Sequence, residues 1–179
     1  MSTGFSIKNS LFLFLLWLAS TNLQAEVLFQ PLGQAAKELS KLPEWNLSIS
    51  PEGEGLPAGS GTAAQGKQIF ALKCAACHGP EAIGGSAEPL VGEVGSLNSN
   101  YPEKTVNSYW PYATTLFDYI RRAMPIDAPF SLNSNEIYAL CAYILSQDGI
   151  IDPSMKLNKA TLPQVTMPNR DGFSAVYPQ

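Results

Sequence analysis

Histidine and cysteine are scarce in this sequence. Among 179 residues there is one histidine, His78, and there are three cysteines, Cys74, Cys77 and Cys141. With no second histidine and no evident nucleophile–base pair, we expect no substrate chemistry from the chain's own side chains. The odd number of cysteines also means that disulfide pairing alone would leave one thiol over.

Basic residues are also few. The 15 Asp and Glu residues outnumber the 11 Lys and Arg residues, which gives a formal net charge of −4 with histidine neutral. Nucleic acids and anionic membrane surfaces bind most strongly to clusters of Lys and Arg. The charge balance therefore argues against both as partners, and we expect no nucleic-acid partner.

The apolar run near the start of the chain is short for a membrane span. Residues 11–19 (LFLFLLWLA) are apolar without interruption, whereas a spanning helix needs roughly 20 such residues. Lys8 precedes the run, and small and polar residues follow it up to Ala25. This layout predicts a cleaved secretory signal peptide over residues 1–25, and hence a periplasmic protein without a stable membrane span.

Glycine and proline divide the rest of the chain. Residues 51–61 are too rich in both to form a helix, and prolines interrupt residues 152–179. We predict an N-terminal extension over residues 26–60, a helical core domain over residues 61–150 and an irregular C-terminal tail over residues 151–179. The expected strand content is small, so the predicted fold class is all-α.

Two helices are predicted before the cysteines. Residues 34–42 have the composition of a short helix, and Thr62 is a suitable N-cap for a second helix that runs to Lys73. The apolar side of this second helix is predicted to consist of Ile69, Phe70 and Leu72.

Two further helices follow. Thr114 or Thr115 opens a helix that ends near residue 123, and its predicted buried face recurs at helical spacing through Leu116, Tyr119, Ile120 and Ala123. Another helix begins near residue 134 and stops before Gly149. Its apolar stripe consists of Ile137, Leu140, Cys141, Ile144 and Leu145. The place of Cys141 on this stripe predicts a small buried apolar residue rather than a reactive thiol.

Residues 74–78 read Cys-Ala-Ala-Cys-His, which is the attachment motif of c-type haem. A zinc site would need two further Cys or His ligands, and only Cys141 remains. A thioredoxin-like redox pair would need a βαβ setting, whereas a helix without a nearby strand pattern precedes this motif. The motif therefore predicts one haem c, bound covalently through Cys74 and Cys77, with His78 as an axial ligand of the iron.

A methionine is the expected second axial ligand. Met124 follows the predicted helix 114–123 and precedes Pro125, so a loop can carry it over the other face of the haem. Met167 is the alternative, while Met155 lies in a polar stretch. Packing in the core is the other role open to each methionine. His/Met ligation raises the reduction potential above that of bis-histidine ligation, which suits an electron relay.

Aromatic and basic residues gather shortly before the predicted methionine ligand. Trp110 and Arg121 are candidates for contacts with the haem propionates or the haem pocket. Tyr109, Tyr112 and Arg122 belong to the same group. Ordinary packing of the aromatic rings and solvation of the arginines are the alternative interpretation.

Four stretches of the sequence resemble one known family. They are residues 55–62 (GLPAGSGT), 73–79 (KCAACHG), 110–125 (WPYATTLFDYIRRAMP) and 161–173 (TLPQVTMPNRDGF). Together they resemble the cytochrome subunit of sulfane dehydrogenase, the molybdenum–haem enzyme of the thiosulfate-oxidising Sox system. The resemblance extends over most of the chain between Trp45 and Phe173.

This resemblance implies a class I cytochrome c fold with long irregular N- and C-terminal extensions. It implies that Cys74, Cys77 and His78 hold the haem and that Met124 is the distal ligand. The implied partner is a molybdopterin-containing subunit that oxidises the sulfane sulfur on a carrier protein's cysteine, or sulfite in a related enzyme. Electrons would leave that subunit one at a time through this haem, towards a downstream cytochrome c or oxidase.

One feature departs from the family pattern. Family members in this role are often longer and carry a second cytochrome module, whereas this chain has a single haem motif. A truncated family form, a subunit of a sulfite-dehydrogenase type and a stand-alone carrier of the same lineage therefore stay open.

The main prediction is an electron-transfer subunit of an oxidoreductase complex, without a catalytic site of its own. The alternative is a freely diffusing electron-carrier cytochrome c of the respiratory chain. The long arms on both sides of the core favour a subunit, because a simple shuttle needs neither. A third class, a haem enzyme or gas sensor, would need an open iron site, which ligation by Met124 closes.

Overall fold

The helix that leads into the haem motif begins where the sequence predicts. In the computed structural model, which describes residues 48–174 and 176, helix α2 spans Ala63–Lys73 with Thr62 as its N-cap. The Thr62 side chain accepts a hydrogen bond from the Gln65 N–H, and the Gln65 side chain accepts one from the Thr62 N–H. This reciprocal pair satisfies two N–H groups that the start of a helix leaves without partners.

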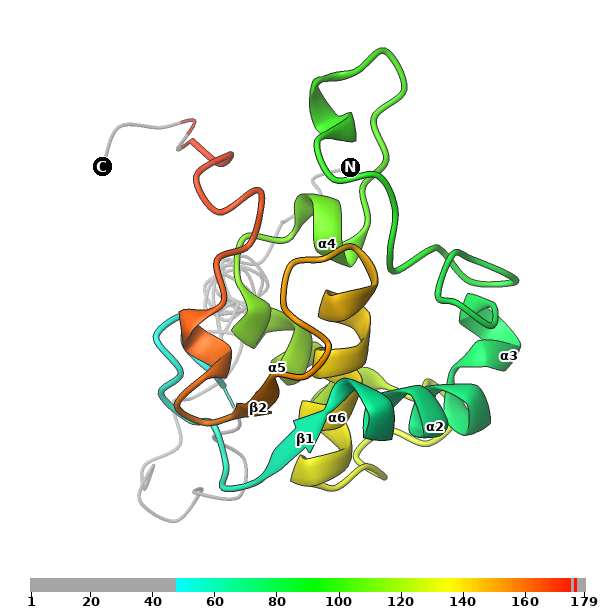
Figure 1. Cartoon of the computed structure of the whole chain (residues 1–179), viewed down its shortest axis with the longest axis vertical. Helices are drawn as coiled ribbons and strands as arrows, with labels where there is room; N and C mark the ends of the chain where they lie inside the picture. The colour runs from blue at the N-terminus through cyan, green and yellow to red at the C-terminus, as the bar shows by residue number, and fades with distance from the viewer. Residues whose placement is uncertain (1–47, 175, 177–179) are drawn as a thin grey trace, which may run out of the picture. The chain divides into compact units, whose positions relative to one another are not determined.

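The prediction of an all-α fold with little strand is confirmed. Each of the two described strands has only three residues. Figure 1 shows α2 and α5 (Ala113–Ala123) beside α6 (Ser134–Gln147), with long irregular segments between the helices. Besides α2, the described elements are, in chain order, β1 Ser60–Thr62, α3 Ala75–His78, η2 Ser96–Asn98, α4 Val106–Tyr109, α5 Ala113–Ala123, α6 Ser134–Gln147, β2 Lys156–Asn158 and η3 Leu162–Gln164.

Helix α6 is the centre of the described core. Asn133 caps it through a reciprocal pair with Glu136, as Thr62 caps α2. Every residue from 137 to 145 is buried, because α2, α5 and both strands pack around this helix. The predicted stripe is therefore correct but too narrow. The polar surface of α6 is confined to its two ends, and both ends contact segments near the haem motif.

The crossing of α2 and α6 depends on a glycine. In Figure 1, α2 lies across α6. A side chain at Gly66 would meet the Ala139 carbonyl of α6 and would place its Cβ 2.7 Å from that of Tyr143. Gly66 therefore weakens the helical propensity of α2 but allows the two backbones to approach closely. Phe70 and Tyr143 pack next to this contact, with ring centroids 5.2 Å apart.

The predicted apolar side of α2 is partly wrong. Phe70 is buried and Ile69 is half-buried, but Leu72 is 85% exposed. Two residues span roughly 200° around a helix, so Leu72 and Phe70 cannot face the same neighbour. Leu72 is thus an exposed apolar side chain two residues before the first cysteine of the motif.

The predicted buried face of α5 is also partly wrong. Leu116 and Ile120 are buried, but Tyr119 is about half exposed. The face is centred closer to Phe117, which is fully buried and lies against Tyr138 of α6 with ring centroids 4.5 Å apart. The buried face of α5 is centred there because both α6 and η3 pack on this helix.

The C-terminal tail packs on the core despite its irregular sequence. Strand β2 pairs antiparallel with β1, and Gly61 lies opposite Leu157. Leu157, Leu162, Val165 and Met167 are buried in the same cluster as the helices. The tail is therefore an integral part of the core, although most of it is neither helix nor strand.

The described residues all fall within a compact unit that spans Pro43–Gln179. The predicted signal peptide, residues 1–25, and the predicted helix over residues 34–42 lie outside the described residues. Within the part of the chain that is described, no helix has the length and apolar character needed to cross a membrane.

Replacing Gly66 by alanine tests the helix crossing. Where space is available, this change stabilises a helix by about 1 kcal/mol. Here the added methyl group would overlap backbone of α6, and overpacking typically costs about 1–3 kcal/mol or more. We expect net destabilisation in chemical denaturation of the haem-loaded protein. The control Lys67→Ala, on the exposed side of α2, should change stability by less than about 0.5 kcal/mol. A Gly66→Ala protein as stable as the wild type would contradict the close approach.

Candidate functional site

The two cysteines of the motif lie on one helical turn that continues from α2. The N–H groups of Cys77 and His78 both donate to the Cys74 carbonyl, at 3.1 and 3.0 Å. Residues three apart share one face of such a turn. Cys74 is half-buried and Cys77 is exposed. The arrangement presents both sulfur atoms on the same side of the turn, as attachment to two vinyl groups of one porphyrin requires.

The charged residue next to the motif forms an ion pair with a residue of α6. Lys73 precedes Cys74 and forms an ion pair with Glu136 in the first turn of α6, at 2.9 Å. The Asn133 N–H, together with Lys73, holds the pKa of Glu136 below its usual value. Burial raises the pKa of the Cys74 thiol to about 11, against the opposing effect of the Lys73 charge.

The chain reverses direction immediately after the histidine. Gly79 has a φ of 77°, a left-handed conformation that favours glycine. A side chain at this position would also collide with the Gly84 carbonyl. The Gly84 N–H donates to the His78 carbonyl at 2.9 Å and closes the reversal. The following loop is thereby brought back alongside the imidazole ring.

The His78 ring is oriented by a backbone carbonyl. Its Nδ1 lies 2.9 Å from the Glu88 oxygen. A carbonyl only accepts hydrogen bonds, so Nδ1 carries the proton and Nε2 carries the lone pair. This is the tautomer that a metal-binding histidine needs, with its second nitrogen held by an outer partner. The Nε2 atom of His78 is therefore suited to bind the iron of a haem.

Met124 lies where α5 ends. It is the C-cap residue, half-buried, and its N–H donates to the Ile120 carbonyl at 3.1 Å. The alternative ligand, Met167, is 1% exposed and belongs to the main apolar cluster, while Met155 is 41% exposed. Of these three methionines, Met124 alone is half-buried at the junction of a helix and a loop.

Large apolar side chains are exposed next to both predicted ligands. Leu72 and Ile83 flank the motif and are 85% and 63% exposed. Ile126 and Phe130 follow Met124 and are 77% and 59% exposed. Exposed side chains of this size carry a free-energy cost in water. They provide apolar surface in the segments that a haem, or a partner protein, would cover.

The aromatic residues before Met124 divide into two groups. Trp110 is half-buried and packs edge-on against Tyr119, with ring centroids 5.6 Å apart. Tyr109 instead packs against Phe173, and Tyr112 lies under the guanidinium of Arg170, 5.0 Å from its ring centroid. Two of the three aromatic candidates therefore contact the C-terminal tail.

The two arginine candidates also differ. Arg122 forms an ion pair with Asp118, one turn earlier in α5. Arg121 is half-buried and lies near enough to Tyr138 for its charge to oppose the effect of burial, which raises the pKa of Tyr138 to about 12. Arg121 is thus the arginine on the core side of α5. Cys141 is fully buried, and burial raises the pKa of its thiol, in agreement with a structural role.

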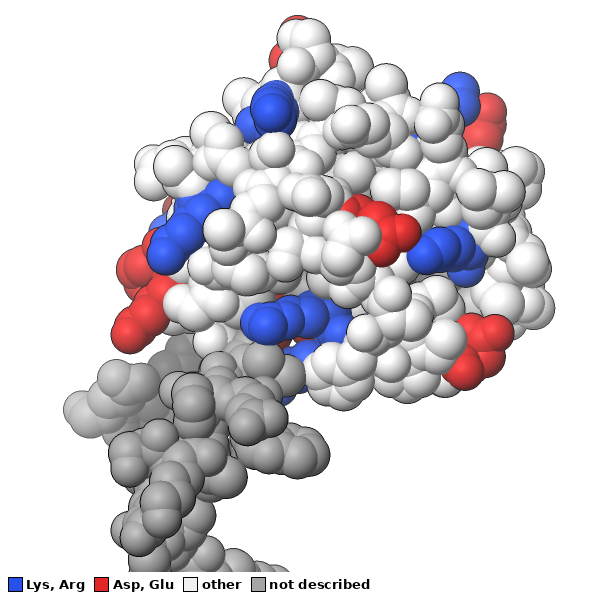
Figure 2. All heavy atoms as spheres, turned by 90° about the horizontal axis from the view of Figure 1, so that it is seen from below, with Lys and Arg blue, Asp and Glu red and all other residues white. Residues whose placement is uncertain are grey.

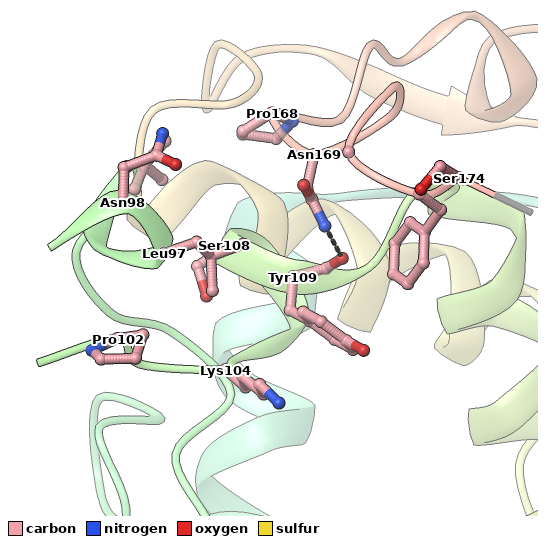
Figure 3. A pocket seen from close by; sticks show the side chains of 13 residues that line it. Leu97, Asn98, Pro102, Lys104, Ser108, Tyr109, Pro168, Asn169 and Ser174 are labelled. Carbon is pink, nitrogen blue, oxygen red and sulfur yellow. Dashed lines mark hydrogen bonds between the residues drawn. The ribbon is translucent and has the colours of Figure 1, made fainter. Parts of the chain in front are cut away.

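A groove of about 720 Å³ lies at another place on the molecule. Figure 3 shows its lining, in which the Asn169 side chain donates to the Tyr109 carbonyl at 2.7 Å. Its apolar lining includes Leu97 and Phe173, and none of the predicted haem ligands takes part. The groove is a feature of the junction between α4 and the tail.

Sequence reasoning did not identify the partner of His78. The Glu88 carbonyl is a backbone group, so no residue type marks it in the sequence. The fully buried Asn107 in α4 was missed as well. A single asparagine in a loop-rich stretch carries no pattern that distinguishes a buried amide from an exposed one.

Comparisons with known proteins identify the family of this chain. Residues 63–148 match the cytochrome c family model. The chain is similar to a chain in the crystal structure of the sulfane dehydrogenase SoxCD from Paracoccus pantotrophus, with 38% sequence identity and a TM-score of 0.72. That similarity covers 84% of this chain and 72% of the other. No curated protein matches the sequence.

The family match runs from the first residue of α2 to the C-cap of α6 and includes the whole of the haem motif. The similarity to the sulfane dehydrogenase chain is well above the level at which only a fold is shared, and it bears out the resemblance seen in the sequence. The chain therefore belongs to the cytochrome c family, whose members carry haem c and transfer electrons, and it is a relative of a sulfane dehydrogenase chain.

Proposed function

We propose that this chain is a periplasmic, mono-haem c-type cytochrome that transfers electrons as the haem subunit of a molybdenum dehydrogenase acting on sulfane sulfur or sulfite. One observation carries this proposal. The similarity to the SoxCD chain covers 84% of the sequence, whereas the cytochrome c model matches only residues 63–148. The likeness therefore includes segments that a minimal cytochrome does not have.

The same residues hold the haem in this proposal as in the sequence prediction. Cys74 and Cys77 attach a single haem, because the sequence contains one motif. His78 and Met124 are its axial ligands, and Trp110 and Arg121 contribute to the pocket. When bound, the haem supplies a one-electron carrier. The protein contributes the position of this carrier, the exclusion of water and the choice of ligands.

The packing of the tail supports a subunit. The tail is fixed to the core by β2 and by five buried apolar residues, among them Leu162 and Met167. Its far end, around Phe173, lines an open groove. A diffusing carrier gains nothing from such an appendage, whereas a subunit gains an additional contact surface. This surface and the exposed apolar residues near the motif are the proposed contacts with the molybdenum subunit and with a downstream cytochrome c or oxidase.

Surface charge supports the same view. On the face shown in Figure 2, most of the described Lys and Arg side chains lie apart from one another, and several have acidic neighbours. Long-range steering between a free carrier and its partners works best with a large patch of one sign. A permanently bound subunit does not need such a patch, because its partner is already in place.

Substitution of Met124 tests the proposed axial ligation. We expect Met124→Ala to lose the spectroscopic signature of thioether ligation in the oxidised protein, to bind added cyanide faster and to have a lower reduction potential, because methionine ligation raises it. The matched controls are Met155→Leu and Met167→Leu, which should keep the wild-type spectrum. Loss of the signature in Met167→Leu, with Met124→Ala unchanged, would make Met167 the ligand instead.

Isolation of the native protein tests the proposed partner. A C-terminally tagged chain purified from the periplasm under mild conditions should bring a second, larger polypeptide and near-stoichiometric molybdenum, measured by elemental analysis. The control is the same purification after a high-salt wash, because a stable apolar interface resists salt better than an ionic one. A pure haem protein without molybdenum or a second chain would overturn the subunit proposal in favour of a free carrier.

A further inference from the structure

The carbonyl that orients His78 lies on a loop that is held from several directions. We call residues 88–92 the carbonyl loop. Within the same reversal, the N–H groups of Leu90 and Val91 both donate to the Ala82 carbonyl, at 2.8 and 3.2 Å. Ala82 is fully buried and has a φ of 65°, which a non-glycine residue adopts only at a cost. These local bonds shape the loop, but they do not connect it to the helical core.

Asn107 makes one connection to the core. Its backbone N–H donates to the Leu90 carbonyl at 3.4 Å. Its side-chain Nδ2 donates to the Ile144 carbonyl and to Asp148 Oδ2, both at 2.8 Å. The amide oxygen is buried and has no hydrogen-bond partner among the described residues. Burying an unpaired acceptor lowers the stability of the fold, and an apolar residue would avoid this loss. The two donated bonds are therefore what this asparagine contributes.

Asp148 makes the other connection. It is the C-cap residue of α6, and its Oδ2 accepts from the Gly92 N–H at 3.2 Å in addition to the bond from Asn107. A carboxylate at a helix C-terminus is unfavourable, because the last carbonyl groups already carry partial negative charge. The bonds from Asn107 and Gly92 explain why an acidic residue occupies this place. Through them, the end of α6 holds the end of the carbonyl loop.

We propose that Asn107 and Asp148 are positioning residues for the proximal histidine, which hold the Glu88 carbonyl in place to accept from His78 Nδ1. This inference rests on the proposed ligation of the haem iron by His78. A hydrogen bond from Nδ1–H to a carbonyl makes the imidazole a more basic ligand and fixes its orientation. A more basic ligand favours Fe(III), so loosening the loop raises the reduction potential of the haem.

Three variants of the haem-loaded protein test this role. Asp148→Ala removes the acceptor, so we expect a higher reduction potential and several-fold faster hydrogen exchange of the Gly92 amide. Asp148→Asn removes the same charge but keeps an oxygen that accepts both bonds, so its exchange rate should stay close to that of the wild type. Asp152→Ala removes a nearby exposed carboxylate and is the charge-matched control, with both readouts expected at wild-type values.

The outcomes separate this inference from the function on which it rests. The spectrum of the wild-type protein is recorded first, and absence of histidine ligation there would overturn the proposed ligation by His78. With ligation present, identical potentials and exchange rates in Asp148→Ala and Asp148→Asn would overturn the positioning role alone. A lower melting temperature of Asp148→Ala without either change would do the same, because it would show a purely structural role. A higher potential in Asp148→Ala than in Asp148→Asn would support the proposal.

Discussion

Close contact between α2 and α6 determines where the haem motif lies. The absence of a side chain at Gly66 lets α2 cross directly over the backbone of α6 at Ala139. Because α2 continues into the turn that carries both cysteines, the crossing point fixes that turn relative to the core. The ends of α6 then secure the surroundings of the motif. Glu136 pairs with Lys73 on one side, and Asp148 holds Gly92 on the other. One almost completely buried helix thus supports both the attachment turn and the loop that orients the histidine.

The C-terminal segments outside the region that the cytochrome c model matches also pack on the helices of the core. Strand β2 and the apolar residues of the tail extend the core beyond the region that the cytochrome c model matches. The same segments belong to a chain of which 84% is similar to a sulfane dehydrogenase chain. In the proposed function, this additional surface contacts another subunit, which performs the substrate chemistry while this chain holds the haem.

Local signals in the sequence predicted much of this structure, and non-local contacts account for the errors. The capping residue Thr62, the helical stripe of α6 and the haem motif are each encoded within a few neighbouring residues, so they were recognisable. The exposure of Leu72 and Tyr119 depends on which elements pack against each helix, and no local pattern contains that information. The pairing of β1 with β2 joins residues far apart in the chain. The carbonyl of Glu88 was invisible for a different reason, since a backbone group carries no residue signature.

The most direct test of the proposed function is the reduction of the haem by substrate, followed by stopped-flow absorption spectroscopy. The native complex and the isolated haem-loaded chain are each mixed with sulfite or a sulfane-sulfur donor. The account predicts rapid reduction of this haem in the complex and none in the isolated chain, because it assigns the substrate chemistry to the partner subunit. Equal reduction rates in both samples, or no reduction in the complex with either donor, would contradict it.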